Sequence, residues 1–425
     1  MNEEKFTEVS YTSWGQRIKD SITGILMGLL FFLCAFPLLF WNEGRAVNRY
    51  KTLKEGASSV ISISPDKVQP SNEGRLVHVS GRCTTEETLS DPELMVSVNA
   101  IKLKRIVEMY QWKETSETRT EKQVGGKEKE TTTYTYSKVW SSREIPSSGF
   151  KQSGYHNPGS MPFASAEYTA DLVHMGAFQL SQNLIQKINA YKPFPINRSN
   201  NLPAGLGNRG QIYGSGFYIG MDPSSPEIGD VKITYQMVPP LTVSLVAGQS
   251  DNSFTPYQTN AGGTIELLQT GAYTADQMFQ KSRQTNTIVT WLIRLGGFLL
   301  MLMGLNLIFK PLSVLADVIP LAGSLVGTGT GMIAFLLSIV LSSATIAIAW
   351  IVYRPVFGIS LLVVSAGITS FVVIKGMKNK AQLPPVPSAA PSMSPRSSSP
   401  ASSGPPVPPV PPPPPSSGPP PPPPS

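Results

Sequence analysis

Two ionisable residues lie where the chain is otherwise apolar, and they are the first places to look for chemistry. Arg294 lies within the apolar residues 288–309, and Asp317 lies within the apolar residues 312–330. A charge at membrane depth is costly, so it usually faces protein or water and often marks an ion pathway. Arg294 is about two turns from the start of its run, so its guanidinium can instead snorkel to the interface. Asp317 becomes a partner for Arg294 if its segment folds back.

The other polar residues give no pattern that is typical of catalysis. The two cysteines and three histidines suit neither a disulfide framework nor a zinc site. No nucleophile motif, phosphate-binding glycine loop or acidic pair stands out. The net charge is +7, but no stretch interleaves basic residues with aromatics as a nucleic-acid groove does. We therefore expect no enzyme, cofactor, metal site or nucleic-acid partner, although a large domain can assemble a site from distant residues.

Small residues recur at a spacing that allows helices to approach closely. Gly323, Gly327 and Gly331 have small-xxx-small spacing, as do Gly24 and Gly28. Such faces let helix backbones touch and can drive association. The alternative is that these glycines only reflect the high glycine content of membrane helices. We predict helix packing through the first three glycines and self-association of the protein.

The elements that must position these residues are membrane helices. An unbroken apolar run of the right length to cross a bilayer follows a polar N-terminus at 1–21, and no signal-peptidase site follows it. Aromatic and basic residues close three later runs, as interface anchoring requires. The four predicted transmembrane helices are 22–41, 288–309, 331–353 and 356–374. Asp317, Pro320 and several glycines interrupt 312–330, which favours an interfacial or re-entrant segment over an extension of the third helix.

Residues 46–287 have the pattern of a large extramembrane domain. Apolar and polar residues alternate through 231–237 and 241–245, which predicts strands. Residues 101–112 and 131–140 flank a charged stretch centred on Gly125-Gly126, which predicts a long β-hairpin whose tip is either solvated or a docking surface. Apolar spacing predicts a helix over 164–191. We therefore expect an α-helical multi-pass membrane protein with a large β-rich α+β domain between helices one and two.

Two polar segments suggest modification or recognition. Asn197 begins a glycosylation sequon, which matters only in a eukaryotic secretory lumen. Residues 384–425 are rich in proline and serine and cannot bury a core, so we expect a disordered tail with polyproline II character. Its proline runs suit SH3, WW or EVH1-type domains, and the alternative is an inert tether.

The distribution of basic residues predicts the orientation. Four helices put both termini on one side, and the basic residues near the helix ends, Arg17 and several lysines, favour the cytoplasm for that side. Basic residues after the first helix, from Arg45 to Lys54, oppose this assignment. We expect residues 1–21 and the tail in the cytoplasm and residues 46–287 across the membrane.

Several short blocks, in order along the chain, resemble the transmembrane protein 43 family, also called LUMA. They begin with Trp41-Asn42-Glu43-Gly44-Arg45, continue through His156-Asn157-Pro158 and end with Trp350-Ile351-Val352-Tyr353-Arg354-Pro355. The resemblance implies four membrane helices, a lumenal domain and a non-enzymatic role. It implies residence in the endoplasmic reticulum and inner nuclear membrane of animals, with self-association and binding to emerin and lamins. The proline-rich tail departs from the family pattern.

Two functions follow as hypotheses. The leading one is a membrane scaffold in the lipid bilayer that gathers partners, such as other membrane proteins, around its extracytoplasmic domain and helices. The alternative is a channel or transporter subunit, motivated by Arg294, Asp317 and the glycine-rich segment. The compartment would be the endoplasmic reticulum or inner nuclear membrane in a eukaryote and the inner membrane in a bacterium.

Overall fold

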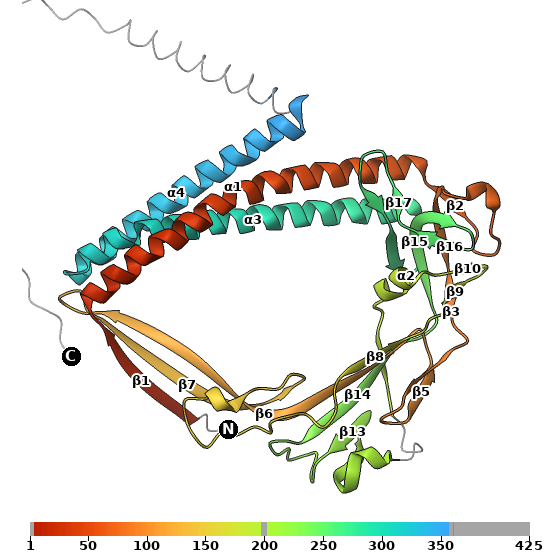
Figure 1. The fold of residues 1–425 in the computed structure, drawn as a ribbon, viewed down its shortest axis with the longest axis horizontal. Coiled ribbons are helices and arrows are strands. Elements are labelled where there is room, and N and C mark those ends of the chain that lie inside the picture. The colour runs from red at the N-terminus through yellow and green to blue at the C-terminus, as the bar shows by residue number, and fades with distance from the viewer. Residues whose placement is uncertain (1–3, 197–201, 357–359, 361–425) are drawn as a thin grey trace, which may run out of the picture. The chain divides into compact units, whose positions relative to one another are not determined.

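In the computed structural model, residues 4–196, 202–356 and 360 are described. Within these residues, three helices are long and apolar enough to cross a membrane: α1 (Trp14–Ser59), α3 (Ala275–Ala316) and α4 (Pro320–Tyr353). The short helix α2 (Gln182–Lys187) belongs to the β-rich domain. Figure 1 shows α1 and α3 running side by side, with α4 against both. The predicted helix at 356–374 and the predicted tail at 384–425 lie outside the described residues, apart from 356 and 360.

Each of the two long helices α1 and α3 begins at a side-chain cap. The Ser13 hydroxyl accepts a hydrogen bond from the Gln16 amide at the start of α1. Thr274 and Gln277 form a reciprocal capping box at the start of α3, and such boxes fix the first turn of a helix. Both helices extend well beyond the predicted spans 22–41 and 288–309, because polar flanking turns continue the helix outside an apolar run.

Residues 312–330 do not form the separate interfacial or re-entrant segment that the sequence favoured. They divide into the end of α3, a turn at 317–319 and the first turns of α4. Asp317 caps α3, and Pro320 stands at the first position of α4, where its missing N–H leaves no intrahelical bond unmade. The proline therefore starts a helix here instead of interrupting one.

The described strands form two larger sheets and two small hairpins. The eight-stranded sheet contains β1 (Glu4–Thr12), β6 (Lys102–Lys122), β7 (Glu128–Ser141), β8 (Ala166–Thr169), β11 (Lys192–Phe194), β12 (Gly210–Tyr213), β13 (Gly216–Ile219) and β14 (Val231–Val238). The seven-stranded sheet contains β2 (Ile61–Ile63), β3 (Leu76–Thr84), β9 (His174–Met175), β10 (Phe178–Gln179), β15 (Leu241–Ser250), β16 (Ser253–Thr255) and β19 (Leu267–Thr270). The hairpins are β4 (Thr88–Asp91) with β5 (Val96–Asn99) and β17 (Tyr257–Gln258) with β18 (Thr264–Ile265).

Three apolar clusters hold these elements together. The largest lies between the two sheets and includes Val79 of β3, Val107 of β6 and Leu245 of β15, all fully buried. A second cluster joins α1 and α3 to the seven-stranded sheet through Leu53 and Phe279. A third packs α1, α3 and α4 against one another. The helix pair is thus packed onto the domain as well as covalently joined to it.

The predicted hairpin is confirmed. β6 and β7 pair from Met109↔Ser141 to Lys122↔Glu128. Gly125 and Gly126 at its tip have φ of 84° and 76°, a region that glycine adopts without steric cost. The predicted strands at 231–237 and 241–245 are confirmed as β14 and the first half of β15.

The predicted helix at 164–191 is wrong except for its short central piece, α2. The segment contains β8, β9 and β10, and Gly176 has a positive φ of 59° that ends any regular helix. A side chain at Gly176 would also overlap the Pro65 carbonyl. The apolar spacing reflects burial instead, because Leu180, Leu184 and Ile188 all contribute to the inter-sheet core.

β1 lies outside the domain in sequence but belongs to its sheet. It pairs with β7 along its whole length, from Glu4↔Tyr136 to Thr12↔Glu128. Paired strands share one side of a bilayer, so this pairing argues against placing residues 1–21 and 46–287 on opposite sides, and that assignment stays a prediction. The positive-inside rule counts lysines and arginines near helix ends and does not register strand pairing.

Candidate functional site

The strongest candidate site is a charge pair where α1, α3 and α4 meet. Glu43 follows the apolar part of α1 and is fully buried. Its Oε1 accepts from Arg294 Nε at 2.7 Å, and its Oε2 accepts from Arg294 Nη2 at 2.9 Å. Trp350 of α4 donates its indole N–H to the same Oε2 at 2.8 Å. Two-point contact is the strongest arrangement of an arginine–carboxylate pair. The pair joins α1 to α3, and the Trp350 bond joins α4 to both.

Aromatic rings complete the surroundings of Arg294. Its guanidinium carbon lies 4.8 Å from the ring centre of Trp291 and 5.7 Å from that of Trp350, which are cation–π distances. Arg294 is therefore held within the helix bundle and does not snorkel. Its expected partner, Asp317, caps the opposite end of α3. That pairing was wrong because α3 and α4 form a helical hairpin and do not fold Asp317 back toward Arg294.

A polar layer continues the pair by one helical turn. Asn42 donates to the Thr290 carbonyl at 3.1 Å. Arg45 donates to Asn286 Oδ1 at 3.1 Å and to Thr290 Oγ1 at 3.0 Å. Because α1 and α3 exchange these bonds at the edge of their apolar parts, the layer fixes their relative register.

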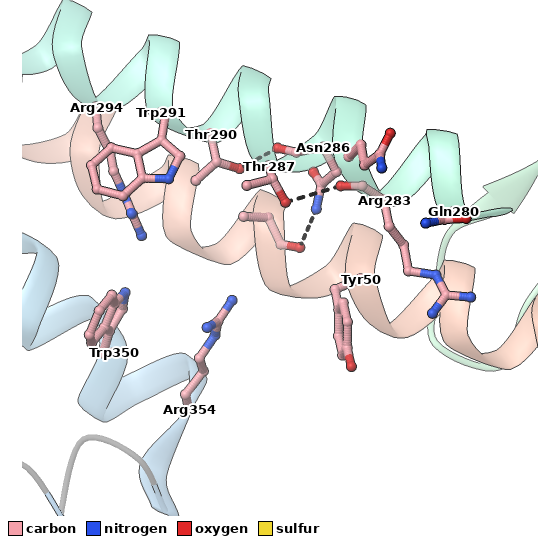
Figure 2. A pocket seen from close by; sticks show the side chains of 12 residues that line it. Tyr50, Gln280, Arg283, Asn286, Thr287, Thr290, Trp291, Arg294, Trp350 and Arg354 are labelled. Atoms are coloured by element: carbon pink, nitrogen blue, oxygen red, sulfur yellow. Dashed lines mark hydrogen bonds between the residues drawn. The ribbon is translucent and has the colours of Figure 1, made fainter.

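A cavity opens beside this layer. Its volume is about 490 Å³, and Figure 2 shows the side chains that line it. They come from α1 (Ala46, Tyr50), α3 (Gln280, Arg283, Gln284, Asn286, Thr287, Thr290, Trp291, Arg294) and the end of α4 (Trp350, Arg354). Among the described lining residues there are three arginines and no carboxylate, so the charged side chains around the cavity are all positive.

Asp317 forms a second charge cluster at the other end of α3. The fully buried Asp317 contacts Arg17 Nη2 at 2.5 Å and Lys122 Nζ at 2.8 Å. Arg17 also contacts Glu128 at 3.0 Å and donates to the Gly126 carbonyl at 2.7 Å. The hairpin tip is thus docked on the start of α1 and the end of α3, so the interpretation of it as a freely solvated tip does not hold.

The predicted packing glycines lie along α4 where it faces α3. A side chain at Gly323 would overlap Asp317, whereas one at Gly327 would lie 3.6 Å from Ser313. One at Gly331 would lie 3.8 Å from Asn306. Their role in association stays a prediction.

The helices α1 and α3 approach each other closely where two glycines face one another. A side chain at Gly28 would lie 2.8 Å from the Gly304 carbonyl oxygen, and one at Gly304 would lie 2.7 Å from the Gly28 carbonyl oxygen. Glycine is required on both helices at this crossing, because any larger residue would force the backbones apart.

A buried polar network around Asp91 in the domain has the character of a structural cross-link. Arg105 donates to both oxygens of Asp91, at 2.9 and 2.8 Å. Tyr168 and Tyr235 donate to the same carboxylate at 3.0 and 2.6 Å. Burial, and then the bond to Asp91, raises the pKa of both tyrosines, so they stay neutral donors. Among the described residues, no group of three or more His, Cys, Asp or Glu is placed to hold a metal ion.

Sequence reasoning found Arg294 and Asp317 but missed their partners. Glu43 lies just past the first apolar run, where a carboxylate is easily taken for an ordinary flanking residue. Arg17 was counted only as a cytoplasmic charge. One signal was available in the sequence. No acidic residue lies near Arg294 in its own helix, so a buried Arg294 requires a partner from another helix. Asn197 lies outside the described residues.

Comparison with known proteins places the chain in a family. The family model described as Transmembrane protein 43 matches residues 109–355. The rat Transmembrane protein 43 is 36% identical over 356 residues, covering 80% of this chain and 87% of the relative. The human protein is 36% identical, covering 81% and 88%, and the Drosophila melanogaster homolog is 30% identical, covering 80% and 92%. No solved structure matches. With three helices suited to crossing a membrane and a large β-rich domain, the chain is an integral membrane protein that belongs to the transmembrane protein 43 family.

Proposed function

We propose that the protein is a membrane scaffold that holds partner proteins around a β-rich domain fixed to its membrane helices. The observation that carries the proposal is the continuity of α1 and α3 from their apolar parts into the domain. Leu53 of α1 and Phe279 of α3 pack with Leu76 of the seven-stranded sheet in one buried cluster. A rigid connection of this kind keeps a binding surface at a fixed position relative to the membrane, as a scaffold requires.

The edge of the eight-stranded sheet is the surface best suited to partners. β1 is an edge strand, and its side chains Phe6, Val9 and Tyr11 are exposed. Exposed edge strands pair readily with a strand of another chain. Other membrane proteins and a second copy of this chain are the proposed partners. The proline-rich tail, residues 384–425, adds a separate proposed site for SH3, WW or EVH1-type domains.

A channel or transporter subunit is the alternative function. The charges that motivated it, Arg294 and Asp317, are each held in buried ion pairs that cross-link elements of the fold. A conducting pathway needs charges that exchange partners with the ion, whereas these have fixed protein partners. Their geometry supports the scaffold.

We further propose that the protein is not an enzyme. The relatives are named only as transmembrane proteins, and the Asp91 network has its acceptors occupied by protein donors. In a eukaryote the proposed compartment is the endoplasmic reticulum and inner nuclear membrane, and in a bacterium it is the inner membrane.

Crosslinking followed by mass spectrometry in native membranes tests the scaffold. We expect the same partner proteins to be crosslinked to the intact chain and to a variant with Arg119→Gln, which removes an exposed charge. A variant with Phe6→Glu and Tyr11→Glu on β1 should lose the partners that bind the sheet edge. Selective ion flux in liposomes, with no reproducible protein partner in native membranes, would instead establish the channel.

A further inference from the structure

The cavity beside the Glu43–Arg294 pair carries positive charge that the protein does not neutralise. Arg294 is compensated by Glu43. Arg283 and Arg354 also line the cavity, and no described carboxylate lies within ion-pair distance of either. Both are exposed, so an external anion can reach them. The cavity therefore has two uncompensated guanidinium groups and an open side.

The two arginines line the cavity from different helices. In Figure 2, Arg283 extends from α3 and Arg354 from the end of α4, with Tyr50 of α1 between them in this view. A second cavity of about 600 Å³ adjoins the first and is lined by Lys51 and Lys54 together with Arg354. A planar guanidinium matches the geometry of phosphate oxygens, and the presence of several cations along the two cavities distinguishes this site from one snorkelling arginine.

The position of the cavity matches that of lipid headgroups. Trp291 and Trp350 line it, and tryptophan is enriched where membrane helices meet the headgroup layer. Toward the apolar part of the helices, α3 exposes Leu292 and Leu295 and α4 exposes Ile348. A ligand with its phosphate among the arginines would have an apolar surface beside it for acyl chains.

We propose that this cavity binds the phosphate group of an anionic phospholipid, with Arg283 and Arg354 as its principal contacts. The site goes beyond the proposed scaffold function and does not depend on it. The chemistry required is a phosphate anion at the membrane interface. That phosphate can belong to a lipid headgroup or to a soluble phosphate compound, and the experiment separates the two.

The test uses the full chain in phosphatidylcholine nanodiscs. Binding of spin-labelled phosphatidic acid is compared with that of spin-labelled phosphatidylcholine by the fraction of motionally restricted label. We expect a preference for phosphatidic acid, and the double variant Arg283→Gln and Arg354→Gln should bind it roughly thirtyfold more weakly. Replacing both arginines with lysine should restore most of the preference, because charge near the surface is retained.

A matched control removes the same charge elsewhere. Arg119 and Arg143 are exposed on the domain, away from the cavity, and replacing both with glutamine should leave the preference unchanged. Inorganic phosphate and glycerol phosphate serve as competitors. If these competitors displace the lipid at low millimolar concentration, the cavity is a phosphate site whose ligand is a soluble phosphate compound. An equal preference in the double variant and the control, with native thermal unfolding in both, would overturn the proposal.

Discussion

Removing the charge of Glu43 should destabilise the helix bundle strongly. Glu43→Gln keeps the volume of the side chain but leaves the Arg294 guanidinium without its carboxylate, in a bundle where Glu43 is fully buried and Arg294 is 14% exposed. Breaking a buried ion pair by removing one partner costs about 3–5 kcal/mol, because the remaining charge is left uncompensated. The measurement is equilibrium unfolding in detergent micelles.

A double-mutant cycle separates the pair from its surroundings. Arg294→Gln alone should cost a similar free energy of unfolding, since it leaves the carboxylate buried. The double variant contains two neutral amides, so its cost should fall below the sum of the single costs by about 2–3 kcal/mol. Glu117→Gln is the control, because Glu117 pairs with Arg119 at the surface and such pairs contribute about 0–1 kcal/mol. Single costs below about 1 kcal/mol, or strict additivity, would refute the assignment of this pair as the link between α1, α3 and α4.

Three further predictions concern the helix crossing, the buried thiol and the N-terminal strand. Gly304→Leu should abolish close packing of α1 on α3 and lower thermal stability in detergent. Gly296→Leu should do neither, because a side chain at Gly296 meets open space. Equal effects of the two substitutions would contradict close packing of α1 and α3 at Gly304. Burial raises the pKa of Cys83 from 9.0 to about 12, so the folded protein should resist alkylation there at pH 9. Because the thiol ionises at lower pH in the unfolded chain, the free energy of unfolding should fall as the pH rises from about 9 toward 12, by up to ~1.4 kcal/mol per pH unit. The fall should be smaller in Cys83→Ala. Rapid labelling of Cys83 in the folded protein would count against a raised pKa. Cysteines at the paired positions Glu8 and Thr132, in a variant without native cysteines, should form a disulfide. If the two cysteines are instead labelled from opposite sides of the membrane, without crosslinking, residues 1–21 and 46–287 lie on opposite sides as the sequence predicts.

Local patterns predicted the elements whose periodicity is long and uninterrupted. The apolar run at 22–41 has the length of one membrane-spanning helix, and the alternation through Val231–Val238 has the period of a strand. The hairpin was predictable because Gly125-Gly126 supplies the two positive φ values that its turn uses. These features depend on neighbouring residues, so the sequence contains them directly.

Features that depend on distant residues could not be predicted. The whole domain lies between Glu43 and Arg294 in the sequence, and nothing local marks them as a pair. β1 joins its sheet only through β7, whose residues lie beyond the first membrane helix. Leu180, Leu184 and Ile188 have helical spacing, yet they cover a core between sheets. Burial by a tertiary neighbour thus produced the same pattern that a helix would produce.

The pairing of β1 with β7 also affects the order of synthesis. β1 leaves the ribosome before its partner strand, which follows roughly 5–25 s later at ordinary translation rates. During that interval the strand has no intramolecular partner, and its Phe6, Val9 and Tyr11 side chains remain available. When two chains are made side by side, β1 of one can complete the sheet of the other without losing a backbone bond, since α1 acts as the connecting arm. We therefore predict that strand exchange during translation can yield a dimer, and that its yield rises with the local density of ribosomes on the membrane.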